Sequence, residues 1–210
     1  MKILKTDCLS DGFRMPGEFE KQDGCLMIYP WRPGSWNYNA KYARDVFVEI
    51  AHILGAYEDV YMIVRPEDMN EAITRLDHPH IHIIEASSDD AWARDTGPTF
   101  VINDKGERRG INWEFNAWGG SYDGLYSHWE NDQLIPNHLC KYLGDDLYEA
   151  RPFVLEGGSI HVDGEGTLIT TEECLLSPGR NPTMTRDEIE EKLKQYLNVE
   201  KIIWLPYGIY

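Results

Sequence analysis

The 210-residue chain contains 20 Lys and Arg residues against 36 Asp and Glu residues, a formal net charge of −16 at pH 7. This acidity argues against nucleic acid and anionic membranes as partners, because both are bound by basic protein surfaces. With 42% hydrophobic residues the chain can bury a sizeable core, which argues against intrinsic disorder. An acidic surface suits a cationic ligand, although solubility is the commoner explanation of such a charge.

The sequence gives no sign of secretion or of a membrane span. Neither the N-terminus nor any internal segment has the apolar run that a signal peptide or a membrane helix needs. The four cysteines (Cys8, Cys25, Cys140 and Cys174) lie far apart without a CxxC pair, so they form no zinc or redox motif. We therefore expect reduced thiols in a cytoplasmic protein.

The first half of the chain alternates strand-like runs with helical patterns. Gly24–Pro30 is an apolar run of strand length. The next helix is predicted by a four-residue spacing that gives one apolar face and ends at Gly55: Tyr38, Tyr42, Val46, Ile50 and Leu54. Strands are predicted at Asp59–Val64 and Ile81–Glu85, separated by a shorter helix from Pro66 through Leu76.

The second half predicts two hairpins, each followed by a helix. Turn residues separate Thr99–Asn103 from Gly110–Phe115, and Ser159–Asp163 from Thr167–Thr171. The helices are expected at 131–143 and 186–197, the second with a capping box formed by Thr185 and Glu188, and a last strand at 201–206.

Strand, helix and strand thus recur at irregular spacing with no linker between the copies. Irregular repetition of one α/β unit favours a radially repeated α/β fold over separate domains. We expect residues 1–210 to form a single α/β domain.

The segment Ser87–Pro98 concentrates charge and aromatic character directly after a predicted strand. Carboxylates accept paired hydrogen bonds from a guanidinium group, and the Trp92 face adds cation–π attraction, so Asp89, Asp90 and Asp95 could bind a planar cation. The alternative is a turn whose aspartates cap backbone N–H groups, with Arg94 paired to one of them.

Glu156 stands at the end of an apolar strand and is followed by Gly157 and Gly158. Because glycine has no side chain, these two residues allow another backbone to approach closely. Burial there would raise the pKa of Glu156 toward that of a general acid or base, whereas a plain bend between strands is the structural alternative. His161 and Asp163 share one face of the next strand, where Asp163 could orient the imidazole, but a solvent-exposed polar pair on a hairpin explains the pattern at least as well.

Three further features have a structural explanation as well as a functional one. Trp113 and Trp118 either form the wall of a pocket or anchor their Gly-rich loop to the core. The alternating histidines of the segment 77–83 favour a strand edge with neutral imidazoles over a metal site. Cys174 lies among acidic residues that raise a thiol pKa, so it is a poor nucleophile.

Several long motifs, in the same order, resemble the agmatine deiminase family: Asp11–Glu20, Pro30–Trp36, Asp89–Pro98, Asn116–Gly120 and Phe153–Gly164. The resemblance covers almost the whole chain, from about Asp11. It implies a five-bladed α/β propeller (the pentein fold) that hydrolyses agmatine to N-carbamoylputrescine and ammonia, on the route to putrescine. By position, Asp95 matches the carboxylate that grips the guanidinium group and Glu156 the catalytic Glu beside the catalytic His. Trp92 would line the pocket.

The chain also departs from this family. The family's nucleophilic Cys lies in Gly-Gly-Gly-Asn-Ile-His-Cys and its catalytic His in Gly-His-Val-Asp, and neither motif occurs here. The resemblance therefore implies an N-terminal part of about three blades, inactive alone because it lacks the thiolate. It also implies a homo-oligomer and no cofactor or metal.

Three other functions remain open from the sequence. A glycosidase would use paired carboxylates beside aromatic residues, but the order of the motifs argues against it. A guanidinium-binding module without catalysis and a peptidyl-arginine deiminase both agree with the motifs present.

Overall fold

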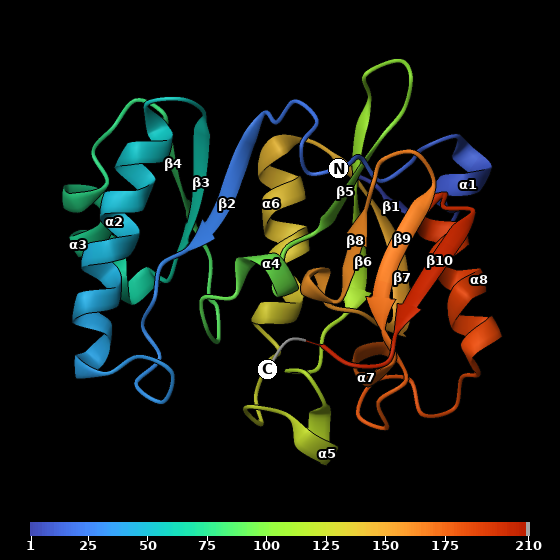
Figure 1. Cartoon of the computed structure of the whole chain (residues 1–210). Coiled ribbons are helices and arrows are strands. Elements are labelled where there is room, and N and C mark those ends of the chain that lie inside the picture. The colour runs from blue at the N-terminus through green and yellow to red at the C-terminus, as the bar shows by residue number, and fades with distance from the viewer. Residues whose placement is uncertain (209–210) are drawn as a thin grey trace.

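The computed structural model describes residues 1–208 as a mixed α/β fold, which confirms the predicted class. Three sheets stand side by side, with strand orders β2-β3-β4, β1-β7-β6-β5 and β10-β9-β8 (Figure 1). The strands are β1 (Ile3–Leu4), β2 (Gly24–Ile28), β3 (Asp59–Val64), β4 (Ile81–Glu85), β5 (Thr99–Ile102), β6 (Arg108–Glu114), β7 (Asp146–Val154), β8 (Ile160–Val162), β9 (Thr167–Thr171) and β10 (Lys201–Leu205).

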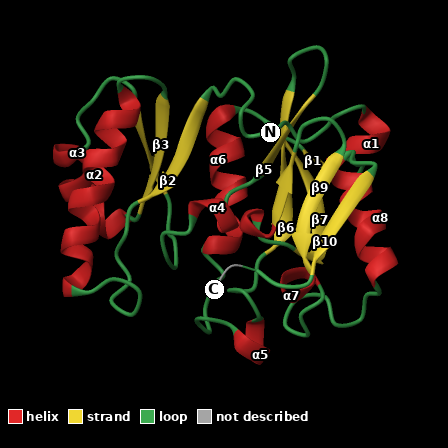
Figure 2. Cartoon of the chain, in the orientation of Figure 1, coloured by secondary structure: helices red, strands yellow, loops and turns green. Residues whose placement is uncertain are grey.

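Helices cover the outer faces of the first and third sheets, and α6 (Ile135–Leu143) lies between the first and second (Figure 2). They are α1 (Cys8–Asp11), α2 (Lys41–Gly55), α3 (Met69–Arg75), α4 (Ala93–Thr96), α5 (Gly120–Asp123), α6 (Ile135–Leu143), α7 (Glu172–Leu175) and α8 (Arg186–Leu197). No helix within residues 1–208 has both the length and the apolar character needed to cross a membrane.

The first sheet is entirely parallel, since α2 and α3 return the chain to the same edge between its strands. Successive side chains of a strand point to opposite faces. Val60, Met62 and Val64 of β3 therefore pack against the side covered by α2 and α3, while Ile63 packs on the other face with Leu139 of α6. Burial on both faces explains the continuous apolar runs of these strands.

The second and third sheets share one plan. In each, an antiparallel hairpin (β5–β6 and β8–β9) is followed by a helix and by a strand parallel to the second hairpin strand. Both predicted hairpins are thus confirmed. The predicted capping box is confirmed too, because the Glu188 carboxylate accepts the Thr185 N–H at 2.7 Å and the Thr185 hydroxyl accepts the Glu188 N–H at 3.3 Å.

Helix α2 differs from its sequence pattern in two respects. It begins at Lys41, because the three residues before it adopt positive φ angles of 53–60°, and it includes Gly55 as its last residue. Most of the stripe of four-residue spacing lies exposed, with Tyr42 60% and Val46 52% accessible, whereas Leu54 at its end is half-buried against the core. The helix packs on the sheet through the opposite side, where Ala51 is fully buried.

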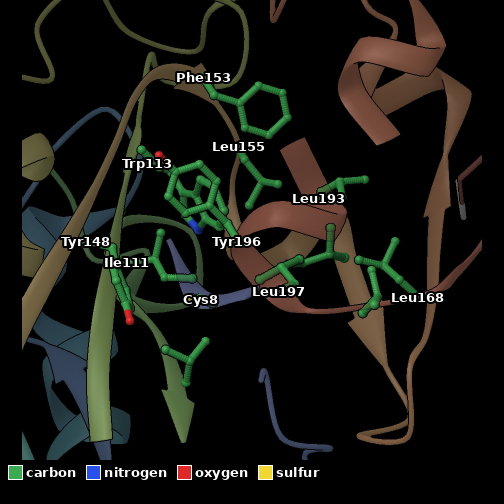
Figure 3. Close-up of a cluster of buried hydrophobic side chains, with 14 of the residues drawn as sticks. Cys8, Ile111, Trp113, Tyr148, Phe153, Leu155, Leu168, Leu193, Tyr196 and Leu197 are labelled. Atoms are coloured by element: carbon green, nitrogen blue, oxygen red, sulfur yellow. The ribbon is translucent and has the colours of Figure 1, made fainter. Parts of the chain in front are cut away.

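The largest core cluster joins the second and third sheets to α8 (Figure 3). Leu193 and Leu197 of α8 are fully buried, and Tyr196 meets Trp113 of β6 edge-on at 5.4 Å between ring centroids. This packing fixes the ends of β6 and β7. The loops that carry Trp118 and Glu156 follow these two strand ends.

Candidate functional site

Asp95 lies on the short helix α4, half-buried, where segments from all three sheets meet. Its Oδ1 accepts the backbone N–H of Gly158 at 2.7 Å, and its Oδ2 accepts the indole N–H of Trp118 at 3.0 Å. Each carboxylate oxygen has two lone pairs, so each retains one acceptor site for a further donor. Two fixed donors thus orient this carboxylate while leaving it able to bind a ligand.

The two glycines after Glu156 make this approach feasible. A Cβ atom at Gly157 would lie 2.2 Å from the Arg94 carbonyl oxygen, and one at Gly158 would lie 2.5 Å from Oδ1 of Asp95. Both distances are shorter than real Cβ contacts allow. The close backbone approach predicted from the two glycines is therefore present, and it brings Glu156 and Asp95 together.

Glu156 is 2% exposed and lies close enough to Asp95 for the two charges to interact. Its Oε1 accepts the Arg180 Nε–H at 2.9 Å, and its Oε2 accepts the Ser159 hydroxyl at 2.9 Å. Burial raises the pKa of Glu156, while the charge of Arg180 and the Ser159 hydrogen bond lower it and the charge of Asp95 raises it again. The structure thus holds a carboxyl of raised pKa beside a second carboxylate.

Trp92 lies in an aromatic wall next to Asp95. Its ring stacks on Trp36 at 5.8 Å and meets Trp118 edge-on at 5.6 Å between centroids. Its indole N–H donates to Oδ2 of Asp90 at 2.9 Å, and 36% of its surface is exposed. The three predicted site residues, Asp95, Glu156 and Trp92, therefore converge, with Trp118 between Trp92 and Asp95.

Asp89 and Asp90 accept hydrogen bonds from the surrounding protein, which is the structural alternative to cation binding. Both are buried, and Asp89 accepts the Asn131 N–H at 2.8 Å while Asp90 accepts the Trp36 indole N–H at 2.8 Å. Arg94 pairs with Glu18 rather than with an acid of its own segment. These two aspartates hold the loop in place, which leaves Asp95 as the accessible carboxylate of the segment.

Arg180 is the member of the site that the sequence did not identify, and Trp118 has a contact that the sequence did not predict. The sequence predicts Trp118 as a pocket wall or a loop anchor, and in the structure its indole N–H donates to Asp95. Arg180 lies six residues after Cys174, in a segment without a recognisable motif, and it pairs with Glu156. A lone Arg in the Pro- and Gly-rich stretch 177–182 was the only signal that could have indicated it.

The remaining sequence candidates lie away from the site or are buried. His161 and Asp163 are exposed on the β8–β9 hairpin, where Asp163 accepts backbone N–H groups of the turn. Burial raises the pKa of Cys140 to about 12 and that of Cys25 to about 11, which disfavours a thiolate at either residue. His80 and His82 both contact Asp59, and no set of three metal-ligating side chains converges within residues 1–208.

The arrangement offers a cation two kinds of attraction. The Asp95 carboxylate has unused acceptor sites, the Trp118 indole contacts it, and the Trp92 ring packs against Trp118. A carboxylate beside aromatic rings is an arrangement that can attract a planar cation.

The comparison with known proteins identifies the family. The model of the Porphyromonas-type peptidyl-arginine deiminases matches residues 14–210, so the chain belongs to this family. A Streptococcus mutans protein named "Putative agmatine deiminase" is 51% identical over 99% of the chain. The chain spans 57% of that protein's length.

Solved structures show the same relationship. The agmatine deiminase of Enterococcus faecalis superposes with a TM-score of 0.95 at 47% identity, over 99% of this chain and 56% of that one. The agmatine deiminase of C. jejuni gives a TM-score of 0.78 at 26% identity, over 94% of this chain and 57% of that one. The resemblance stated from the motifs is thus confirmed at the level of the family.

Proposed function

We propose that these residues form the substrate-gripping part of an agmatine deiminase, which hydrolyses agmatine to N-carbamoylputrescine and ammonia. The observation that carries the proposal is Asp95, oriented by Trp118 and Gly158 with acceptor sites to spare. A guanidinium group donates two parallel N–H bonds to a carboxylate, which matches this geometry. The relatives at about 50% identity bear the name agmatine deiminase, which favours agmatine over peptidyl-arginine.

Residues 1–210 would supply some of the catalytic groups that the reaction needs, and other residues would supply the rest. A thiolate attacks the guanidinium carbon, the C–N bond to the departing nitrogen breaks, a proton makes that nitrogen leave as ammonia, and water then releases the product from sulfur. Asp95 would hold the guanidinium nitrogens during attack. Glu156, with its raised pKa, would act in proton transfer or orient the group that performs it. The thiolate and the imidazole would come from residues outside these 210.

The architecture extends the same proposal. The three side-by-side sheets would be three blades of a five-bladed pentein propeller, with residues 1–210 forming one partial domain. The shared plan of the second and third sheets supports such repetition. We further propose a cytoplasmic homo-oligomer that acts on a small cationic substrate without a cofactor.

The test uses a fusion protein, defined as residues 1–210 followed by the C-terminal part of the Streptococcus mutans relative that this chain does not match. Ammonia release is measured with agmatine and with a peptide containing arginine, and release of the phenol is measured with an arylglycoside. The proposal predicts turnover of agmatine above the other two, and its loss in Asp95→Asn. Preferred turnover of the peptide would assign a peptidyl-arginine deiminase, and agmatine binding without any turnover would assign a binding module.

A further inference from the structure

Arg180 is nearly buried and contacts two parts of the site at once. It lies between α7 and α8, and its side chain is 9% exposed. Its Nε–H donates to Oε1 of Glu156 at 2.9 Å, and its terminal N–H group donates to the Trp118 carbonyl. The carboxylate of Asp123 lies 4.0 Å from the same guanidinium group.

The backbone on both sides of Arg180 is anchored. The side chain of Asn181 accepts the Val154 N–H at 3.0 Å and donates to the Val154 carbonyl at 2.9 Å. On the other side, the Asn116 amide donates to the Gly179 carbonyl at 2.8 Å. These bonds tie the Arg180 loop to the end of β7 and to the Trp118 loop, so the guanidinium group has little freedom to move.

The contact with Trp118 extends the influence of Arg180 to Asp95. Ala117 and Trp118 have φ angles of 54° and 67°, in the left-handed region that side chains with a Cβ atom disfavour. Such a backbone persists only where its surroundings hold it. Arg180 binds the Trp118 carbonyl, while the indole of the same residue donates to Asp95.

We propose that Arg180 is a positioning residue that fixes the Glu156 carboxylate directly and the Asp95 carboxylate through Trp118. The proposal rests on the function proposed above, because it assigns Arg180 to the two carboxylates of that site. A direct role in binding agmatine is unsuited to Arg180, because like charges repel and because its Nε–H and one terminal N–H group already donate to Glu156 and Trp118.

The test follows the contacts of both carboxylates by NMR and does not require enzymatic turnover. Carbon-13 NMR follows the titration of the Glu156 carboxyl in the 210-residue chain, assigned with Glu156→Gln, and nitrogen-15 NMR follows the Trp118 indole, assigned with Trp118→Phe. The charged groups near Glu156 are Arg180 and Asp95, with Asp123 on the far side of Arg180. Removing the positive charge of Arg180 should therefore raise the pH at which Glu156 titrates.

Arg180→Met should raise the Glu156 midpoint by at least one pH unit and shift the Trp118 indole signal. Arg180→Lys keeps the charge but has a single donor group, so it should hold the midpoint within half a unit while still shifting the indole. Arg186→Met, which removes an exposed arginine paired with Glu172, should change neither signal.

A folded Arg180→Met with both signals unchanged would overturn the proposal. If Arg180→Met fails to fold, Arg180→Lys decides, because an unmoved Trp118 indole in that variant would show that the second contact has no effect. Neither readout depends on agmatine, so a failure here is separate from a failure of the proposed activity.

Discussion

The indole N–H of Trp118 donates to the Asp95 carboxylate at 3.0 Å although the two residues lie 23 positions apart. The same indole packs edge-on against Trp92, 5.6 Å between ring centroids. One side chain therefore both orients the Asp95 carboxylate and packs against the neighbouring aromatic ring.

Replacing Trp118 with Phe removes this donor and keeps an aromatic ring. A hydrogen bond to a charged group contributes about 1.5–3 kcal/mol, so the KM of the fusion protein for agmatine should rise roughly 10- to 100-fold. Steady-state ammonia release measures it. Trp113→Phe is the matched control, because it removes an indole bond to the Thr99 hydroxyl at 2.9 Å in the core and should lower stability while leaving KM unchanged. Equal KM values in the two variants would contradict the role of Trp118.

Gly158→Ala tests the close approach of the Glu156 loop to α4. The added methyl group would lie 2.5 Å from Oδ1 of Asp95, so the loop must move and the Gly158 N–H bond to Asp95 must lengthen. We expect agmatine turnover by the fusion protein to fall at least tenfold. Gly34→Ala is the control, since its Cβ has no neighbour within 4 Å, and its turnover should match that of the unsubstituted protein. Comparable rates for both variants would show that the approach is not needed.

Asp132 should make the stability of the fold fall as pH rises. It is fully buried, and burial raises its pKa from 3.8 to about 6 despite hydrogen bonds from Tyr126 and the Asp89 N–H. Because the folded pKa exceeds the unfolded one, the folded state binds the proton more tightly, and this contribution is lost as pH rises through about 6.

Urea unfolding at pH 5 and pH 7.5 measures the effect. In Asp132→Asn the titrating proton is absent, so the change in the free energy of unfolding between the two pH values should differ from that of the unsubstituted chain by about 1 kcal/mol. The same pH dependence in both proteins would show that Asp132 does not titrate in this range.

Local sequence patterns predicted the bounds of a helix or strand well where a single structural signal determined them. β3, β4 and α8 have the predicted bounds, because buried parallel strands and a capped amphipathic helix leave clear periodic signals. The stripe on α2 predicted the helix but not its exposed orientation, since the spacing of apolar side chains does not say which face meets a sheet.

The site was predictable only in part for a similar reason. Asp95, Glu156 and Trp92 stand in unusual local motifs, so the sequence marked them. The importance of Trp118 and Arg180 arises from hydrogen bonds to residues 23 and 24 positions away, which depend on how the loops meet in space. No periodicity or spacing in the chain records those contacts.

The most direct test of the account compares ammonia release from agmatine by the 210-residue chain and by the fusion protein. We expect no release above background from the chain alone, because burial suppresses the thiolate of Cys25 and Cys140 and the family's nucleophile motif is absent from the sequence. The fusion protein should release ammonia and should lose this activity in Asp95→Asn. Turnover by the chain alone that disappears in Cys174→Ser, or full activity of the fusion protein with Asp95→Asn, would contradict the account.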